Sequence, residues 1–304
     1  MTNLFELKHV HYPITIGEIS ANHDGSIERV FAMIELAAKY GFDSVKFQTY
    51  TADEMTRPGL YKIPSGLWKG YDLYDLYKKG SMPREWHHDV FQYASENKIL
   101  GCTTVFHPET VGFVEKFAPA AYKIASFEIT YEDLLREAAR TGRPIIFSTG
   151  MATETEILKA SEIVLKYGSG QLFIMKCTSA YPAPYTQLNF NTMKDMINLV
   201  PQAQIGFSDH TEGTLAAAVA ASHGAKCIEK HITLFGNDGL DSAFSLTANQ
   251  YGEFINNIKS AVDSMGVVKY GPTLDEQSSL VYRRSIHTIG DKQMILRPST
   301  GKPL

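Results

Sequence analysis

The chain has 304 residues, of which 44% are apolar and 20% are charged, as in soluble folded proteins rather than disordered or fibrous ones. Its formal net charge of −4 excludes the basic excess typical of proteins that bind nucleic acid or anionic membranes. The N-terminal stretch MTNLFELKHVHYP lacks the features of a signal peptide, and no apolar run approaches the roughly 18 residues that a membrane span needs.

Cysteine usage gives a first expectation about location. Cys102, Cys177 and Cys227 are an odd number of widely spaced thiols, and each lies within an apolar stretch. This pattern predicts buried, reduced cysteines. We therefore expect a cytoplasmic protein that binds neither nucleic acid nor a membrane.

Predicted strands alternate with predicted helices along most of the chain. The strands cover 14–19, 43–48, 99–104, 121–126, 144–149, 172–177, 204–209 and 225–230. Clear helical patterns cover 28–41, 84–98, 156–168 and 214–224. Eight such alternations favour an α/β fold, a (β/α)8 TIM barrel. The alternative, an open doubly wound sheet, normally has fewer strands and a G-x-G-x-x-G turn after the first, which is absent here.

Two further segments complete the predicted organisation. Residues 49–83 are too long for an ordinary connection and are rich in Tyr and Trp, with a short helix near 71–79. These rings could stack on a sugar or close over it, or they could pack against one another. A helix over 247–265 ends a barrel domain that spans 1–265. Residues 266–304 then form a linker and a tail that is too short for a second folded domain.

Polar residues stand at the ends of all eight predicted strands. Isolated charges at strand ends usually face solvent. If solvent exposure were the explanation here, apolar and turn residues would also stand at some of the eight strand ends. In a barrel the C-terminal ends of the strands meet at one mouth, so this pattern predicts an active-site pocket. The residues are Glu18, Lys46, Gln48, Thr103, Thr104, Lys123, Ser126, Ser148, Thr149, Lys176, Ser208, Asp209, His210, Glu229, Lys230 and His231.

Two groups among these residues indicate ligands. Lys46 and Lys123, with nearby serine hydroxyls, suit a phosphate or carboxylate, although a single strand lysine is usually part of an ion pair. His210 and His231 follow neighbouring strands and could reach one divalent ion such as Mn²⁺, although a lone histidine is usually structural. Asp209, Glu229 and Asp241 could provide oxygen ligands or support.

Seven short motifs resemble those of one enzyme family, in the same order. They are E-x-x-x-N-H-x-G from Glu18, VKFQ at 45–48, YKIAS at 122–126, STGM at 148–151, CTSAYP at 177–182, GFSDHT at 206–211 and EKHIT at 229–233. From about residue 14 to residue 284 the chain resembles the N-acetylneuraminate (sialic acid) synthase family. That family also includes legionaminic and pseudaminic acid synthases and a spore-coat polysaccharide branch.

The resemblance implies a transferase that condenses phosphoenolpyruvate with an open-chain N-acyl amino sugar, adds water and releases phosphate by C–O cleavage. It implies a divalent ion, most often Mn²⁺ with Mg²⁺ or Co²⁺ as alternatives, held by His210 and His231. The implied phosphoenolpyruvate ligands are Lys46, Thr103, Lys123, Ser126, Ser148 and Ser208. The implied sugar contacts are Gln48, Glu128, Tyr181 and Asp241. Either Glu18 or Glu128 could handle the attacking water.

The C-terminus departs from the family pattern. Family members usually carry an antifreeze-like domain of about 60 residues, which here is replaced by a short remnant. The fragment from Arg297 to Gly301 resembles a family element whose arginine reaches the sugar site of the partner in a homodimer, and a frayed terminus is the alternative. Octulosonate- or heptulosonate-type synthases and a non-catalytic sugar-phosphate-binding homologue are competing functions. The sugar itself stays open.

Overall fold

The computed structural model describes residues 4–6, 11–236, 239–289 and 293–298. The chain divides into two compact units, Met1–Met265 and Gly266–Leu304, and each is described by itself. None of the helices in these ranges is long and apolar enough to cross a membrane. The cytoplasmic location stays a prediction.

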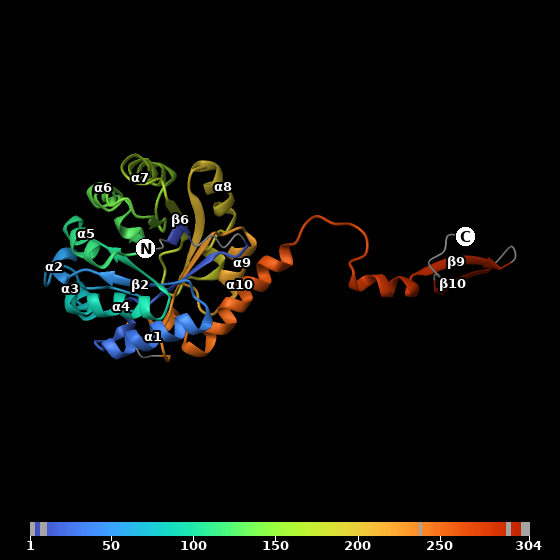
Figure 1. Cartoon of the computed structure of the whole chain (residues 1–304), viewed down its shortest axis with the longest axis horizontal. Helices are drawn as coiled ribbons and strands as arrows, with labels where there is room; N and C mark the ends of the chain where they lie inside the picture. The colour runs from blue at the N-terminus through green and yellow to red at the C-terminus, as the bar shows by residue number, and fades with distance from the viewer. Residues whose placement is uncertain (1–3, 7–10, 237–238, 290–292, 299–304) are drawn as a thin grey trace. The chain divides into compact units, whose positions relative to one another are not determined.

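The first unit is a closed barrel of parallel strands. Each strand pairs with the next in sequence, and β8 pairs with β1 to close the ring. The strands are β1 (Ile14–Glu18), β2 (Ser44–Thr49), β3 (Leu100–Val105), β4 (Tyr122–Ile124), β5 (Ile145–Ser148), β6 (Leu172–Cys177), β7 (Gln204–Asp209) and β8 (Cys227–His231). Helices surround these strands (Figure 1). The predicted (β/α)8 TIM barrel is confirmed.

At least one α-helix follows every strand. The α-helices are α1 (Ile27–Tyr40), α2 (Ala52–Met55), α3 (Leu73–Gly80), α4 (His87–Glu96), α5 (Pro108–Val114), α6 (Glu132–Arg140), α7 (Glu154–Tyr167), α8 (Asn191–Leu199), α9 (Leu215–Ser222) and α10 (Tyr251–Met265). Short 3-10 helices are η1 (Leu4–Glu6), η2 (Ser20–His23), η3 (Arg84–Trp86), η4 (Glu115–Phe117), η5 (Ser126–Glu128), η6 (Tyr185–Gln187), η7 (Ser242–Phe244) and η8 (Ala248–Gln250). The helix predicted over 84–98 thus begins as a 3-10 turn.

Local sequence explains where these helices begin and end. At the start of α1 the backbone N–H of Arg29 donates to Ser26 Oγ at 3.3 Å, and Gly41 ends the helix with φ +90°. A glycine adopts that left-handed conformation without steric cost. Thr153 and Glu156 form a reciprocal capping box at the start of α7. These signals are local, so the alternation of strands and helices can be read from sequence.

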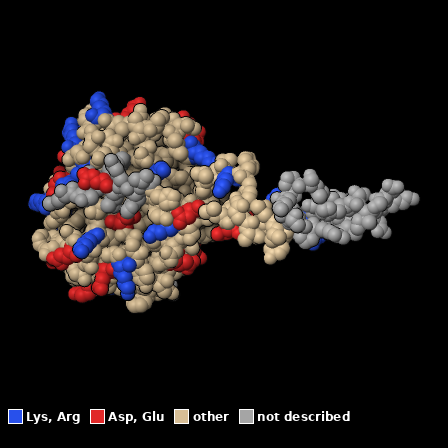
Figure 2. Space-filling model, turned by 45° about the vertical axis from the view of Figure 1, so that its right-hand side comes forward, with Lys and Arg blue, Asp and Glu red and all other residues tan. Residues whose placement is uncertain are grey.

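Apolar side chains pack on both faces of the barrel wall. A small cluster that includes Ile14, Ile16, Cys102 and Cys227 fills the interior below the C-terminal strand ends. A larger cluster packs the strands against the helices. All three cysteines are free and buried, as predicted. On the outer surface, acidic and basic side chains are interspersed across the face of the barrel shown in Figure 2.

The second unit contains a 3-10 helix, η9 (Asp275–Tyr282), and a two-stranded antiparallel sheet of β9 (Arg284–Ile289) and β10 (Gln293–Pro298). Part of the predicted linker is therefore helical. Arg297 lies on β10, where its backbone is in register with Ser285, and its side chain is outside the described part of the structure. The assignment of this unit as a domain remnant stays a prediction.

Candidate active site

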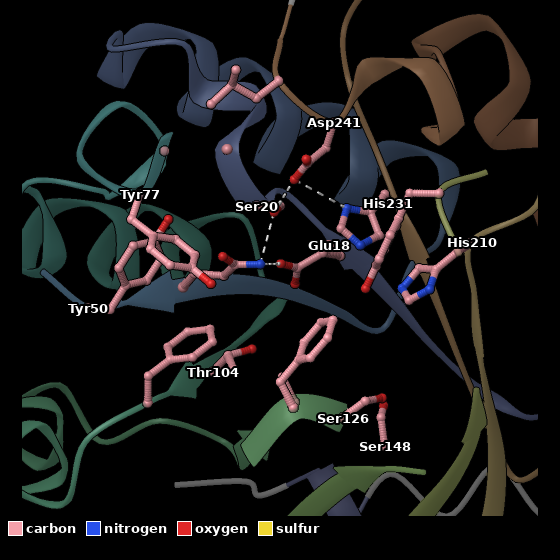
Figure 3. A pocket seen from close by; sticks show the side chains of 18 of the residues that line it. Glu18, Ser20, Tyr50, Tyr77, Thr104, Ser126, Ser148, His210, His231 and Asp241 are labelled. Atoms are coloured by element: carbon pink, nitrogen blue, oxygen red, sulfur yellow. Dashed lines mark hydrogen bonds and ion pairs between the residues drawn. The ribbon is translucent and has the colours of Figure 1, made fainter. Parts of the chain in front are cut away.

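The C-terminal ends of the barrel strands enclose a pocket of about 470 Å³. Figure 3 shows its polar side chains converging from separate strands and loops. Every predicted site residue of the barrel unit lines it except Thr103. Those that do are Glu18, Lys46, Gln48, Lys123, Ser126, Glu128, Ser148, Tyr181, Ser208, His210, His231 and Asp241. Of the other polar residues at the predicted strand ends, Thr104 and Glu229 line the pocket, whereas Thr149, Lys176, Asp209 and Lys230 do not.

A chain of ion pairs crosses the floor of the pocket. Lys46 Nζ lies 2.5 Å from Glu18 Oε2 and 3.7 Å from Glu229 Oε1. Lys123 Nζ lies 2.8 Å from Glu229 Oε2. All four side chains are almost fully buried. Because ions are costly to bury alone, each charge here depends on its neighbours.

The two carboxylates in this row of ion pairs, Glu18 and Glu229, titrate differently. Burial opposes ionisation of Glu229, but the ammonium groups of Lys123 and Lys46 outweigh burial and lower its pKa to about 2. Burial raises the pKa of Glu18 to about 7, even though Lys46 acts in the opposite direction. Near neutral pH, Glu18 can therefore take up or release a proton, whereas Glu229 stays ionised.

Hydroxyl groups surround the lysines. Thr104 Oγ1 accepts a hydrogen bond from Lys46 Nζ at 2.6 Å, and Ser208 Oγ lies 3.4 Å from Glu229 Oε1. Ser148 Oγ is buried without a hydrogen-bond partner in the described part of the chain. A buried hydroxyl without a partner is costly, so Ser148 is free to bind a ligand. Two lysines and these hydroxyls suit a phosphate or carboxylate ligand.

A glycine positions another hydroxyl of this group. The backbone N–H of Gly150 donates to Ser126 Oγ at 3.1 Å. A Cβ at position 150 would collide with the hydroxyl oxygens of Ser126 and Ser179. The STGM motif therefore requires glycine at position 150, because a side chain there would displace Ser126 from the position in which the backbone N–H holds it.

The two histidines stand side by side, with ring centroids 5.3 Å apart. His210 Nδ1 lies 3.1 Å from the Thr178 carbonyl oxygen and 3.7 Å from Cys177 Sγ, which leaves Nε2 for a ligand. Burial opposes protonation of His210, but Cys177 outweighs it and raises the pKa of the ring. Burial and then the charge of His210 lower the pKa of His231, so His231 is a neutral imidazole.

These histidines fit a metal ion that also binds small ligands. His231 Nδ1 is buried without a hydrogen-bond partner in the described ranges. In those ranges there is also no group of three or more His, Cys, Asp or Glu side chains arranged to hold a metal. A metal here would therefore have two histidine ligands, and water or substrate would complete its coordination.

A separate hydrogen-bonded group fixes the side of the pocket next to His231. Ser20 Oγ donates to Asp241 Oδ2 at 2.5 Å, and Gln48 Nε2 donates to both Ser20 Oγ and Glu18 Oε1 at 2.9 Å. Asp241 Oδ2 lies 3.9 Å from His231 Nδ1. The amide nitrogen of Gln48 is thus occupied, which leaves its carbonyl oxygen as the group available to a ligand.

Aromatic residues form another part of the pocket wall. The Tyr181 ring lies 4.5 Å from the His210 ring and 5.4 Å from that of Trp68, between centroids. Tyr50 contacts Tyr77 at 5.8 Å. Tyr61 and Tyr71, by contrast, are exposed. The aromatic segment 49–83 therefore packs its own rings and also lines the pocket.

Thr103 requires a correction. Thr103 faces the helices on the outside of β3, where its hydroxyl lies 2.8 Å from that of Thr49 and 3.2 Å from the Phe47 carbonyl oxygen. Thr104 lines the pocket instead. Successive side chains of a strand point to opposite faces, so two adjacent threonines cannot both face the interior. The predicted contact of Thr103 with phosphoenolpyruvate is therefore wrong.

Asp209 also faces away from the pocket, and it pairs with Lys230 at 3.2 Å. It cannot support a metal as proposed from sequence. Ser20, Cys177 and Phe244 line the pocket and were not predicted as site residues. Ser20 and Cys177 lie inside or beside the motifs described above, so motif position offered a weak signal for them. Phe244 ends the three-residue 3-10 helix η7, which is too short to show a periodic pattern.

The fold and the site together define a class of protein. A (β/α)8 barrel with lysines, carboxylates, hydroxyls and histidines in one pocket at its C-terminal strand ends is a TIM-barrel enzyme. The chain belongs to the NeuB family, whose family model matches residues 33–270. The resemblance seen in the motifs is confirmed.

Relatives and solved structures agree with this assignment. The chain is 37% identical over 285 residues to a pseudaminic acid synthase of Campylobacter jejuni subsp. jejuni, covering 91% of this chain and 81% of that protein. It is 38% identical over 248 residues to the spore coat polysaccharide biosynthesis protein SpsE of Bacillus subtilis. This match covers 80% of this chain and 66% of SpsE. The structure of an N-acetylneuraminic acid synthetase from Leptospira borgpetersenii, in complex with citrate, matches with a TM-score of 0.79 at 25% sequence identity. This match covers 90% of this chain and 91% of the synthetase chain.

Proposed function

We propose that this protein is a nonulosonic acid synthase, which condenses phosphoenolpyruvate with an open-chain N-acyl amino sugar and releases phosphate. Membership of the NeuB family and relatives named as synthases of sialic-acid-like sugars support the reaction class. The observation that carries the proposal is the pocket itself, in which the chain of ion pairs from Glu18 to Lys123 lies beside His210 and His231.

Phosphoenolpyruvate binds at the lysine end of the pocket. Lys46 and Lys123 neutralise its phosphate and carboxylate charges, and the hydroxyls of Ser126, Ser148 and Ser208 orient its oxygen atoms. The free hydroxyl of Ser148 supports this role. The Thr104 hydroxyl accepts a hydrogen bond from Lys46, which leaves its own O–H free to donate to the same ligand.

His210 and His231 hold a divalent ion, Mn²⁺ by preference, with Mg²⁺ or Co²⁺ as alternatives. When bound, the ion supplies Lewis-acid polarisation of the sugar aldehyde. The Thr178 carbonyl fixes the orientation of the His210 ring. The pocket walls keep both substrates close together, which removes much of the entropic cost of bringing them to react.

The bonds change as follows. C3 of phosphoenolpyruvate forms a bond to the aldehyde carbon, and the aldehyde oxygen takes up a proton. Water adds to C2 and gives up a proton, which leaves a hydroxyl on C2. The bond from C2 to the phosphate oxygen then breaks as this hydroxyl becomes the C2 carbonyl, and its proton leaves with the phosphate. Burial raises the pKa of both Glu18 and Glu128 to about 7, so either could exchange a proton near neutral pH. We assign the proton exchange with water to Glu18 because it lies beside Lys46, at the end of the pocket where we place phosphoenolpyruvate. Glu128 then belongs to the sugar side.

Two competing functions are less consistent with the pocket. An octulosonate- or heptulosonate-type synthase acts on a phosphorylated aldose and needs a second phosphate site. Among the described residues that line the pocket, Lys46 and Lys123 are the lysines, there is no arginine, and both lysines are in the same ion-pair chain. A non-catalytic binding protein does not require a carboxylate with a pKa near neutrality beside the anion site.

Phosphate release tests the proposal. The purified protein is incubated with phosphoenolpyruvate, Mn²⁺ and a panel of free and phosphorylated amino sugars. We expect phosphate release that depends on both the sugar and the metal and that stops on chelation. His210→Ala and His231→Ala should each lose at least about a hundredfold in rate. His88→Ala, which replaces an exposed histidine, is the control.

Two outcomes contradict different parts of the proposal. If no sugar in the panel supports phosphate release, the synthase function is wrong. If a thoroughly chelated sample keeps full activity, the synthase function stands and the metal site is wrong.

A further inference from the structure

Asn22 belongs to the E-x-x-x-N-H-x-G motif, and the proposed mechanism does not use it. It lies in η2, the short turn that follows β1, and its side chain is fully buried. It is not among the described residues that line the pocket. A buried amide must form its hydrogen bonds within the protein, so the partners of Asn22 indicate what it holds in place.

The amide of Asn22 binds the segment that follows β8. Its Nδ2 donates to the Ile232 carbonyl oxygen and to Ser245 Oγ, each at 2.9 Å. Its Oδ1 accepts the backbone N–H of Asp241 at 3.2 Å. Ile232 directly follows β8, and the other two partners belong to residues 239–246, which we call the β8 loop. Asn22 therefore ties the turn after β1 both to the end of β8 and to the β8 loop.

The β8 loop comes very close to Asn22. A Cβ at Gly239 would lie 2.5 Å from Asn22 Oδ1 and 2.8 Å from Asn22 Cα, so a side chain at this position would force the loop away. Within the loop, Ser245 Oγ donates to the Asp241 carbonyl oxygen at 2.7 Å. The N–H and the carbonyl of Asp241 are therefore both held, one by Asn22 directly and the other by Ser245, which Asn22 also binds.

The β8 loop brings two pocket-lining side chains, Asp241 and Phe244, to His231. Asp241 Oδ2 lies 3.9 Å from His231 Nδ1, and Figure 3 shows the two side chains next to each other. The Phe244 ring lies 4.8 Å from the His231 ring, between centroids. The position of the loop therefore determines the shape of the pocket next to His231, and Asn22 acts on that shape from outside the pocket.

The lysine end of the pocket is built from other elements. The side chains that we assign to phosphoenolpyruvate come from β2, β4, η5, β5 and β7, and none of them lies on the β8 loop. Figure 3 shows Ser126 and Ser148 on the side of the pocket opposite Asp241. A change confined to the β8 loop should therefore alter sugar binding and spare phosphoenolpyruvate binding.

We infer that Asn22 is a positioning residue for the sugar: it holds the β8 loop where Asp241 and Phe244 lie against His231. This inference rests on the proposed function, which places the sugar aldehyde beside His210 and His231. Without the three hydrogen bonds of Asn22 the loop would gain conformational freedom, and sugar binding would have to restore its order. A role limited to stability would instead weaken the fold and leave the sugar affinity of the folded protein unchanged.

Steady-state kinetics tests this role. Asn22→Ala removes all three hydrogen bonds, and we expect it to raise KM for the sugar at least about tenfold. The sugar used is the panel member that gives the fastest phosphate release with the wild-type protein. Phosphoenolpyruvate affinity, measured by calorimetry without the sugar, should change by less than about twofold, because its site is separate from the loop. Asn256→Ala, which replaces an exposed asparagine on α10, is the matched control.

Ser245→Ala tests the same contact from the side of the loop, and it replaces Asn22→Ala if that variant fails to fold. It removes one hydrogen bond to Asn22 and the bond to the Asp241 carbonyl, so it should raise KM for the sugar by a smaller factor. In the double variant the increase should be less than the product of the two single increases, because both substitutions remove one shared contact.

Hydrogen exchange tests the loop without any substrate. The Asp241 amide donates to Asn22, so exchange in a peptide covering 239–246 should be at least about fivefold faster in Asn22→Ala than in the wild type. Exchange in β5, which has no contact with Asn22 through these bonds, should not change. Asn256→Ala should exchange like the wild type at both places.

The outcomes separate this inference from the proposed function. No phosphate release from the wild-type protein with any sugar overturns the function, and this inference with it. An active wild type with an unchanged KM for the sugar in Asn22→Ala and Ser245→Ala overturns the inference alone, and so does an equal loss of sugar and phosphoenolpyruvate affinity. Unchanged exchange over 239–246 in Asn22→Ala also overturns it, because Asn22 would then not hold the loop.

Discussion

Glu229 controls the charge of the end of the pocket that holds Lys46 and Lys123. Its carboxylate lies between the ammonium groups of Lys123 and Lys46, at 2.8 Å and 3.7 Å. A ligand with negative charge approaches two lysines that this single buried carboxylate holds in place. Removing either lysine therefore both deletes a contact to the ligand and leaves Glu229 less well compensated.

The first prediction concerns these two lysines. Lys46→Met and Lys123→Met should each weaken phosphoenolpyruvate binding at least about tenfold, because each loses a charge-assisted contact in a confined pocket. Ser148→Ala should reduce the affinity for phosphoenolpyruvate by a smaller factor, since it removes one neutral hydroxyl and no charge. Calorimetric titration measures the affinities. Lys176→Met is the control, because Lys176 is also at a strand end but does not line the pocket. Unchanged affinity in both lysine variants would refute the assignment.

The second prediction concerns the pH dependence of stability. Burial raises the pKa of Glu128 from 4.5 to about 7 in the folded protein. As pH rises through that interval, the unfolded chain loses this proton while the folded chain keeps it, so folding becomes less favourable. Gln cannot titrate. Glu128→Gln should therefore gain stability relative to the wild type as pH rises, by about 1–2 kcal/mol after allowance for partial exposure.

Urea unfolding at several pH values between about 4.5 and 8 measures this difference. Glu162→Gln, at an exposed position, should show a difference that does not change with pH. A stability difference for Glu128→Gln that is flat across the same range would contradict a raised pKa.

At the scale of an element, alternate positions of a strand have different roles, because one set of side chains faces the pocket and the other faces the surrounding structure. Glu229 and His231 of β8 face the pocket, whereas Lys230 between them faces outward to Asp209 of β7. Asp209 and Lys230 are directly paired in the register of the two strands. Lys230 Nζ also donates to the Thr211 carbonyl, and Asp209 Oδ1 accepts from the Thr211 N–H at 2.8 Å. These contacts tie together the ends of both strands that carry the histidines.

The third prediction follows from this buried pair. Asp209→Asn and Lys230→Met should each destabilise the fold by about 3–5 kcal/mol, because each leaves its partner as an uncompensated buried charge. The double variant should cost clearly less than the sum. Urea unfolding measures these values. The exposed pair Arg136 and Asp133 is the control and should contribute under about 1 kcal/mol. Additive effects for Asp209 and Lys230 would disprove the coupling.

The same alternation shows what sequence could predict. All eight strands were located, because β-rich runs and helical patterns are local signals. Sequence could not decide which side of the strand faces the pocket where two polar residues are adjacent, as at Thr103 and Thr104. The alternation of polar and apolar residues that would distinguish the two sides is missing there. Ser20 and Phe244 lie in short 3-10 helices, η2 and η7, which are too short to show a hydrophobic period, so their positions depend on tertiary packing.

At the scale of the whole molecule, the barrel unit contains every described residue of the proposed site, and the second unit contains Arg297. The resemblance predicts that this arginine binds the sugar of the partner barrel in a homodimer. A guanidinium group suits that role because it can donate several hydrogen bonds to an amide carbonyl. Arg297→Ala should then raise KM for the sugar and leave phosphoenolpyruvate binding unchanged.

Mixing subunits gives the decisive form of this last prediction. Arg297→Ala protein is mixed with His231→Ala protein under conditions of proven subunit exchange, and phosphate release is measured at low sugar concentration. If the arginine acts across a dimer, one site of each hybrid has both defects and the other is intact, so the mixture recovers activity that neither parent has. If it acts within its own subunit, every site stays defective. No recovery, together with an unchanged KM in the single variant, would show that Arg297 has no part in sugar binding.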